Sequence, residues 1–143
     1  MGCPADGLDR CGAAGYLSVF YDPTKYIAGT NPSLYGPQVP KVVGNYNFLG
    51  CYSEATGQRA LTGKTPTAPT SGFTIELCQQ ACQGFTYFGM EYANQCFCGN
   101  AINAGSVNQN SSDPTVNGCN MVCNGNANEY CGGKFPFPLH KSS

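Results

Sequence analysis

Ten cysteines constrain what this chain of 143 residues can fold into more than any other feature of its sequence. They are Cys3, Cys11, Cys51, Cys78, Cys82, Cys96, Cys98, Cys119, Cys123 and Cys131. An even number at this density predicts a disulfide framework formed in an oxidising, extracellular compartment. Structural zinc is the competing interpretation, but Cys96 and Cys98 are too close for a usual zinc knuckle and the only histidine is His140. We therefore expect disulfides, with no metal and no cofactor.

The rest of the composition indicates an uncharged, polar and aromatic surface. Charged residues make up 10% of the chain, the net charge is -1, and the seven basic residues are scattered along the sequence. Nucleic acids and anionic membranes require clustered lysine and arginine, so the sequence favours neither as a partner. Eight Phe and nine Tyr rings among many amide side chains suit a neutral polar ligand such as a glycan.

The sequence contains no candidate membrane span, since such a span needs about 18 consecutive apolar residues. The opening residues, Met1 to Pro4, also lack the apolar stretch that secretory signals carry. Because a disulfide-rich chain has to be exported, we expect that Met1 is not the native start and that the sequence is a mature or truncated form.

One cysteine frame occurs twice in the sequence. Residues 3–11 and residues 123–131 each begin and end with cysteine, enclose seven residues and are followed by glycine. This internal repeat predicts that residues 1–21 form the C-terminal tail of one repeat. It predicts that residues 46–133 form a complete second repeat.

The stretches that flank the second repeat are expected to differ from it. Residues 15–21 alternate and are rich in aromatic and β-branched side chains, which predicts a closing strand for the first repeat. Residues 22–45 contain four X-Pro pairs, which disfavour helix and predict an extended linker. Residues 134–143 contain two prolines, and we expect an irregular tail there because proline cannot donate to a central β-ladder.

Within the second repeat the sequence predicts one helix and a β-hairpin. Residues 74–83 predict a helix, with Thr74 placed to cap its N-terminus. Residues 47–52 open the repeat as a strand. Residues 87–92 and 95–98 predict two strands joined by a tight turn, and the segments between these elements are polar loops.

The cysteine spacing predicts how the helix is attached to the hairpin. Cys78 and Cys82 are four residues apart, so they share one face of the helix. Cys96 and Cys98 are two residues apart, so they share one face of a strand. We expect two disulfides between these pairs, each worth about 3 kcal/mol in the chain-entropy model, and both matchings stay open.

The remaining cysteines are assigned by comparing the two repeats. The short frame has no other partners in the first repeat, so we expect its two cysteines to bond each other in both copies. This hypothesis predicts the disulfides Cys3–Cys11, Cys123–Cys131 and Cys51–Cys119.

The second repeat contains six distinctive motifs. They are Gly50-Cys51-Tyr52, Arg59-Ala60-Leu61, Thr74-x-Glu76-x-Cys78-x-x-x-Cys82, Tyr87-Phe88-Gly89-Met90-Glu91-Tyr92, Cys96-Phe97-Cys98-Gly99-Asn100 and the run from Cys119 to Gly133. Together these motifs resemble the WSC domain, a cysteine-rich fungal module. The resemblance covers residues 46–133, and the segment from Cys3 to Phe20 resembles the end of a preceding WSC copy.

The resemblance implies a small disulfide-rich α+β fold that is rich in loops, with a short antiparallel sheet and one packed helix, as in apple and PAN modules. It also implies a non-catalytic, secreted carbohydrate-binding module that is associated with the fungal cell wall and occurs in tandem. β-1,3-Glucan is the partner that the resemblance favours, with chitin and xylan as further wall polysaccharides. A structural or mechanosensory spacer and a protein–protein interaction module remain the alternatives.

Glycan sites combine rings that stack on sugars with amides and charged groups that bind hydroxyls. On the predicted hairpin, strand alternation places Phe88 and Met90 in the core. The candidate carbohydrate contacts are Tyr87, Glu91, Tyr92, Phe97, Asn100 and Arg59. In the alternative interpretation these rings pack beneath the disulfides, and Arg59 forms a structural ion pair with Glu91.

The sequence does not predict catalysis. No motif arranges its eight acidic residues as an acid–base pair, and there is no nucleophile elbow, His-Glu-x-x-His or phosphate-binding loop. Asn110-Ser111-Ser112 is a sequon for N-glycosylation on a polar loop. Residues 65–71 offer threonine and serine for O-glycans.

Overall fold

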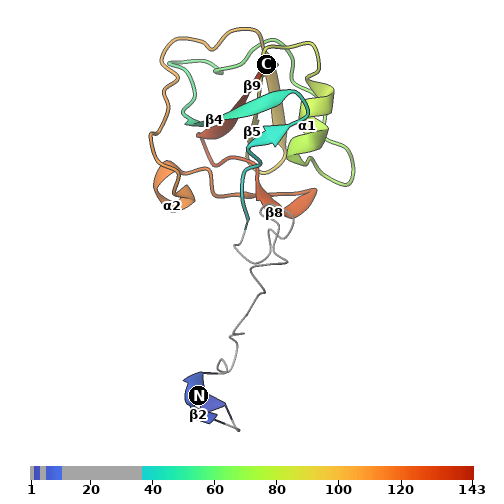
Figure 1. Ribbon diagram of the computed structural model, residues 1–143. Helices are drawn as coiled ribbons and strands as arrows, with labels where there is room; N and C mark the ends of the chain where they lie inside the picture. Colours follow the sequence, from blue (N-terminus) through green and yellow to red (C-terminus); the bar gives the residue numbers. More distant parts are fainter. Residues whose placement is uncertain (1, 4–5, 11–36) are drawn as a thin grey trace. The chain divides into compact units, whose positions relative to one another are not determined.

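The chain divides into two compact units, Met1–Tyr35 and Gly36–Ser143. The computed structural model describes residues 2–3, 6–10 and 37–143 (Figure 1). The second unit extends beyond the predicted repeat of residues 46–133 at both ends.

The described part of the first unit is a small antiparallel hairpin. Strand β1, Gly2–Cys3, pairs with strand β2, Asp6–Arg10. The proposed disulfide Cys3–Cys11 and the expected closing strand at residues 15–21 involve residues outside the described part of the chain. Both therefore stay predictions.

A five-stranded antiparallel sheet forms the centre of the second unit, in the order β3-β4-β9-β5-β6 (Figure 1). The strands are β3 Val42–Val43, β4 Tyr46–Tyr52, β5 Tyr87–Glu91, β6 Gln95–Gly99 and β9 Phe137–Ser142. The expected strand at residues 47–52 and the expected hairpin are confirmed as β4, β5 and β6. Strand β3 lies within residues 22–45, so the end of the predicted linker already belongs to the sheet.

Strand β9 corrects the expectation of an irregular tail at residues 134–143, because it is the middle strand and pairs with both β4 and β5. Pro138 is tolerated because neither neighbouring strand requires its missing N–H. On the β4 side it lies opposite Cys51, whose carbonyl accepts the N–H of Gln109 instead. On the β5 side the ladder begins only at Leu139.

Helix α1, Ile75–Ala81, packs on one face of the sheet and confirms the predicted helix with shorter bounds. Thr74 caps it as expected, because its hydroxyl oxygen accepts the N–H of Leu77. The N–H of the first helical residue donates to the carboxyl group of Glu129. Two side chains therefore satisfy the free N–H groups at the start of this short helix.

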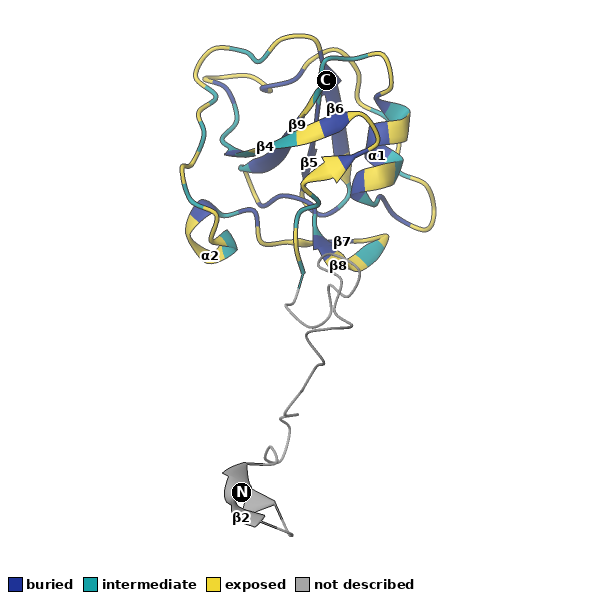
Figure 2. Ribbon diagram, viewed as in Figure 1, coloured by how far each residue is buried: buried dark blue, intermediate teal, exposed yellow. Residues whose placement is uncertain are grey.

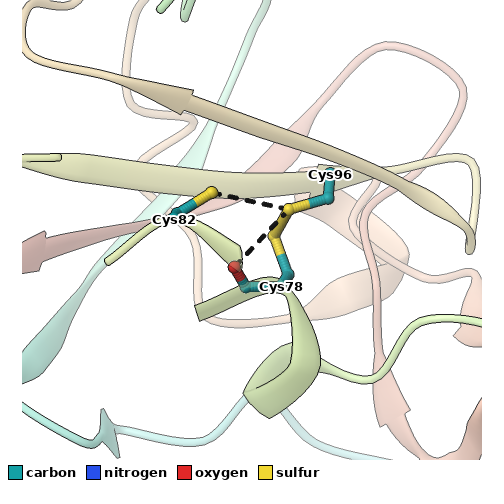
Figure 3. Close-up of side chains that lie close together, drawn as sticks. All are labelled: Cys78, Cys82 and Cys96. Atoms are coloured by element: carbon teal, nitrogen blue, oxygen red, sulfur yellow. Dashed lines mark hydrogen bonds between the residues drawn. A yellow bond between two sulfur atoms is a disulfide. The ribbon is translucent and has the colours of Figure 1, made fainter. Parts of the chain in front are cut away.

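Two disulfides, Cys78–Cys96 and Cys82–Cys98, attach α1 to β6 and settle the matching that the spacing left open. Figure 3 shows how closely the sulfur atoms gather, with those of Cys82 and Cys96 3.6 Å apart. This group of cysteines is not a metal site, because each sulfur atom already belongs to a disulfide. The disulfides Cys51–Cys119 and Cys123–Cys131 match the pairing expected from the repeat.

Buried residues dominate the strands of the sheet (Figure 2), and they form two separate cores. The face that carries α1, called here the helix face, packs a core that includes Tyr46, Ile75, Phe88, Met90 and four disulfide-bonded cysteines of α1 and β6. The opposite face, called the loop face, packs a second core of Ala55, Ala60, Leu61, Phe97, Phe137 and Leu139. Loop residues 53–63 and 100–110 cover it. Phe88 and Met90 thus belong to the core, as strand alternation predicts.

A second hairpin, of β7 Val122–Cys123 and β8 Asn126–Tyr130, follows the short helix α2, Pro114–Asn117. It has the same register as the hairpin of the first unit. Val122 lies opposite Tyr130 as Gly2 lies opposite Arg10, and the register shifts after the first pair in both hairpins. Among the described helices, none has the length and apolarity that a bilayer span requires.

Candidate functional site

The predicted site residues lie on the β5–β6 hairpin and on the loop that covers its loop face. Strand β6 is the edge strand of the sheet, and the segment after the loop pairs with it. Lys64 and Cys98 exchange both of their backbone hydrogen bonds. This pairing anchors the end of residues 53–63, which brings Arg59 over the hairpin.

Three side chains of the predicted set, Arg59, Glu91 and Phe97, form a contact group called here the arginine cluster. The Arg59 guanidinium donates a hydrogen bond to Oε2 of Glu91. It also lies 4.6 Å from the centre of the Phe97 ring, in a cation–π arrangement. The side chain of Arg59 is 45% exposed, whereas that of Glu91 is 1% exposed. The guanidinium is therefore the part of the cluster that faces solvent.

Glu54 belongs to the same cluster and was missed by the sequence analysis. Its carboxylate accepts the N–H of Ala60 and lies 3.9 Å from the Arg59 guanidinium. Burial raises the pKa of Glu91 to about 8, and the neighbouring Glu54 adds to this rise while Arg59 opposes it. The Glu91 carboxyl group therefore retains its proton at neutral pH, and Glu54 balances the charge of Arg59.

The electrostatics of the arginine cluster agree with its hydrogen bonds. Oε1 of Glu91 is buried and accepts no hydrogen bond from the residues that the structure describes. An ionised carboxylate would leave this oxygen unpaired at a substantial cost in free energy, whereas a protonated carboxyl group reduces the cost.

The sequence signal that could have identified Glu54 is its position. It lies two residues after β4, where the chain turns onto the loop face.

Tyr92 lies at the turn of the hairpin, directly after Glu91. Its φ is 49° and that of Ala93 is 63°, both in the left-handed region that side-chain-bearing residues seldom adopt. The carbonyls of Gly133 and Cys131 accept the N–H groups of Tyr92 and Ala93, which holds the turn in this conformation. Tyr92 is 37% exposed. The turn thus holds an exposed tyrosine directly after Glu91, a residue of the arginine cluster.

Tyr87 and Asn100 lie at the opposite end of the hairpin, where Tyr87 pairs with Gly99. Four residues of strand separate this end from Glu91, a distance of about 14 Å. Asn100 is exposed, but its side-chain oxygen accepts the N–H and the hydroxyl of Thr86, so it stabilises the entry to β5. Tyr87 is half-buried and packs against the second core.

The structure therefore divides the predicted residues instead of gathering them at one place. Glu91 is completely buried, and Phe97 is 8% exposed beneath Arg59, so neither side chain presents an open surface, and their contact with a ligand stays a prediction. The structural pairing of Arg59 with Glu91, considered as the alternative, is present as a hydrogen bond from the guanidinium to the carboxyl group. The accessible groups are Arg59 and Tyr92 at the turn end of the hairpin and Asn100 and half-buried Tyr87 at the other end.

A helix bonded by disulfides to a strand at one edge of a short antiparallel sheet defines a small disulfide-rich α+β module. The chain belongs to the WSC domain family, whose sequence profile matches residues 48–133. The match ends before β9, so the central strand of this sheet lies outside the matched segment.

Relatives in fungi and animals share the matched segment. The WSC domain-containing protein of Arthroderma benhamiae is 34% identical over 131 residues, which are 92% of this chain and 16% of that protein. The putative fungistatic metabolite of Chaetomium globosum is 34% identical over 138 residues, which are 93% of this chain and 57% of that protein. Human Kremen protein 1 is 36% identical over 87 residues, which are 59% of this chain and 17% of that protein. The chain thus spans less than two thirds of the length of these relatives.

Membership of the WSC family supports a role as a cell-wall or carbohydrate-binding module, and the family is one of non-catalytic modules. A related segment can form a small part of an enzyme. The relative named xylosyltransferase oxt, from Drosophila melanogaster, is 32% identical over 97 residues, which are 66% of this chain and 10% of that protein. The disulfides fit an extracellular protein.

Proposed function

We propose that this chain is a carbohydrate-binding module that engages fungal cell-wall polysaccharide outside the cell, with β-1,3-glucan as the favoured ligand. The binding surface is the turn end of the β5–β6 hairpin, where Arg59 and Tyr92 are exposed. The arginine cluster carries this proposal, because buried Glu91 holds a guanidinium whose outer side faces solvent.

A guanidinium held in this way suits a ligand that is rich in hydroxyl groups. Arginine presents five N–H donors in a rigid fork, and Glu91 uses only part of them. The contacts with Glu91 and Phe97 restrict the rotamers of Arg59 before a ligand arrives, which lowers the entropy lost on binding. The Tyr92 ring adds an apolar face and a hydroxyl group, as sugar contacts need.

The charge balance of the arginine cluster favours a neutral polysaccharide over an acidic one. Glu54 offsets the charge of Arg59, and the high pKa of Glu91, near 8, keeps its carboxyl group uncharged at neutral pH. β-1,3-Glucan, chitin and xylan backbones are all neutral and hydroxyl-rich. Among them, the association of the WSC family with cell walls supports β-1,3-glucan as the first ligand to test.

The test is co-sedimentation of the oxidised full chain with insoluble β-1,3-glucan, chitin, xylan and cellulose. We expect Arg59→Ala and Tyr92→Ala each to weaken glucan binding about tenfold, which corresponds to about 1.4 kcal/mol. Lys41→Ala is the matched control, because the Lys41 ammonium group lies 4.9 Å from the ring centre of Phe48 on the opposite part of the sheet. This control removes a comparable cation–π pair and is expected to leave binding unchanged.

Three outcomes separate the alternatives. Retention by glucan that both hairpin variants lose and Lys41→Ala keeps supports the proposal. If the folded, oxidised chain is retained by none of the four polymers, the carbohydrate-binding proposal is wrong, and the spacer or protein-contact role takes its place. Retention that the hairpin variants leave unchanged would place the binding surface away from the turn end of the hairpin.

A further inference from the structure

The loop between β6 and α2 carries a feature that the proposed polysaccharide surface does not use, the sequon Asn110-Ser111-Ser112. Asn110 and Ser112 are both exposed. The φ of Asn110 is 55°, a left-handed conformation that asparagine tolerates better than most residues. The sequon therefore lies at an accessible turn, away from either core.

Local hydrogen bonds hold this turn without using the groups that a sequon needs. The side-chain oxygen of Asn108 accepts the N–H of Asn110 at 2.8 Å. The hydroxyl oxygen of Ser111 accepts the N–H of Asp113 at 3.1 Å. Within the described residues, the Asn110 amide group and the Ser112 hydroxyl group take part in no hydrogen bond, so both are accessible in a preformed turn.

The course of the loop places Asn110 on the β4 side of the sheet. The N–H of Gln109 donates to the carbonyl of Cys51, so the residue before the sequon runs beside β4. Strand β9 separates β4 from β5, the strand that Tyr92 follows, which corresponds to about 10 Å across the sheet. A group attached to Asn110 therefore starts beside β4, one strand away from the hairpin that carries Tyr92.

We propose that Asn110 is an N-glycosylation site and that its oligosaccharide projects from the β4 side of the module. The donor is a lipid diphosphate-linked oligosaccharide of the secretory pathway. The amide nitrogen of Asn110 bonds to C1 of the first sugar, the C1–O bond to the diphosphate breaks, and the amide loses one proton. The lipid diphosphate is the leaving group, and no oxidant or reductant is required.

The fold accommodates this modification without rearrangement. The oligosaccharide replaces a hydrogen on an exposed amide group, and it displaces neither a buried side chain nor a described hydrogen bond. The N–H of Asn110, which does support the turn, is a backbone group that the reaction leaves unchanged. Glycosylated and unglycosylated forms are therefore expected to share one fold.

The test is intact-mass measurement of the full chain secreted from a eukaryotic host, before and after digestion with peptide N-glycosidase. We expect a mass excess of one N-linked oligosaccharide, whose removal leaves aspartate at position 110 in peptide maps. Asn110→Gln and Ser112→Ala are expected to abolish the excess. Ser111→Ala is the matched control, because it changes only the middle position of the sequon and is expected to keep the oligosaccharide.

A secreted, fully oxidised chain of unmodified mass would overturn the proposal, and so would an enzyme-sensitive oligosaccharide that persists in Asn110→Gln. The position of the oligosaccharide is tested separately and rests on the proposed polysaccharide binding. Glycosylated chain and chain after glycosidase digestion are expected to bind β-1,3-glucan equally. Stronger binding after digestion would contradict the placement, whereas absence of binding in both forms would reject the proposed function and leave the mass result intact.

Discussion

The two faces of the central sheet are covered in different ways. On the helix face, α1 is tied to β6 by Cys78–Cys96 and Cys82–Cys98. On the loop face, irregular segments are held by single hydrogen bonds, such as that from the N–H of Asn103 to the carbonyl of Ala60, and by the arginine cluster. One face is cross-linked, and the other depends on non-covalent contacts.

This difference separates the residues that stabilise the module from those available for recognition. Phe88 and Met90, with no exposed surface, point to the helix face. Arg59, the exposed charged group of the candidate site, lies on the loop face, and Tyr92 lies at the turn. Because disulfides fix the helix face, the loop face can vary in sequence with less risk to folding.

The largest expected effect compares one ring on each face. Phe88→Ala removes a completely buried ring on the helix face and is expected to cost about 4 kcal/mol in the free energy of unfolding. Phe97→Ala on the edge strand is expected to cost less than half of that, because the half-exposed Arg59 side chain can settle into the space. Urea denaturation under non-reducing conditions measures both. Equal losses would contradict the contrast between the faces.

The second prediction concerns His140, a titratable side chain of the helix face, which stacks on Phe88 with 4.6 Å between ring centres. Its Nε2 is hydrogen-bonded to the carbonyl of Pro40, and burial lowers its pKa from 6.5 to about 4. The imidazole of His140 therefore takes up a proton near pH 6.5 in the unfolded chain but only near pH 4 in the folded chain. The contribution of His140 to stability is therefore full above pH 6.5 and falls by about 3 kcal/mol as the pH decreases toward 4.

Urea midpoints at several pH values check this dependence on His140. His140→Phe, which retains a ring but cannot take up a proton, is expected to flatten the acid limb of the stability curve. An unchanged acid limb in His140→Phe would show that other groups cause it.

The third prediction is the opposite pH dependence on the loop face. The pKa of Glu91 is raised to about 8, so its contribution to stability is complete below its ordinary pKa of 4.5 and is lost as the pH rises through 8. Glu91→Gln keeps a neutral side chain of the same shape. Relative to the parent chain, it is expected to gain about 2.5 kcal/mol in the free energy of unfolding between pH 6 and pH 9.

Thermal unfolding of Glu91→Gln at the two pH values measures this effect. A difference in stability between the variant and the parent chain that is the same at both would contradict a protonated Glu91. Glu91→Ala serves as the comparison, because it removes the support of Arg59 at every pH.

The smallest expected effect lies at the start of α1. Thr74→Ala removes the oxygen that accepts the N–H of Leu77 and is expected to cost about 1 kcal/mol in the free energy of unfolding. Thr74→Ser keeps the cap and is expected to cost much less. Chemical denaturation distinguishes the two variants, and equal losses would show that the hydroxyl group does not act as a cap.

Most of the disulfide pattern was predictable because residue spacing fixes which cysteines share a face. The sequence analysis left open which cysteine of α1 bonds which cysteine of β6, although the directions of these two elements decide this pairing. The chain reverses once between α1 and β5 and again between β5 and β6, so α1 and β6 run in the same direction. The first cysteine of the helix, Cys78, therefore meets the first of the strand, Cys96.

Strand β9 was missed because the sequence analysis assumed that every residue of a central strand donates its N–H to a neighbouring strand. At Pro138 neither β4 nor β5 requires such a donor. A better signal was present in the repeat. The constant offset of 120 residues that relates the two cysteine frames also aligns Leu17 with Phe137 and Val19 with Leu139. This alignment extends the predicted closing strand of the first copy to the second, where its apolar side chains enter the core of the loop face.

Within the candidate site, the sequence alone indicated Arg59 and Glu91 as possible partners, but neither which residues gather at one end of the hairpin nor which of them reach solvent. Arg59 and Glu91 were both identified, yet burial of Glu91 depends on residues 53–63 lying across the hairpin. That placement follows from the backbone pairing of Lys64 with Cys98, for which the sequence contains no periodic signal.

The order of two disulfides along the chain has a mechanical consequence. Cys51 is bonded to Cys119, and shortly afterwards Cys123 is bonded to Cys131. Tension applied across the second unit would pass between residues 51 and 131 largely through sulfur–sulfur bonds, so the long enclosed loop would carry almost no load. Strands β3 and β9 and the first part of β4 lie outside the segment between residues 51 and 131. Under load, the unit would lengthen by releasing these strands and would then become nearly inextensible.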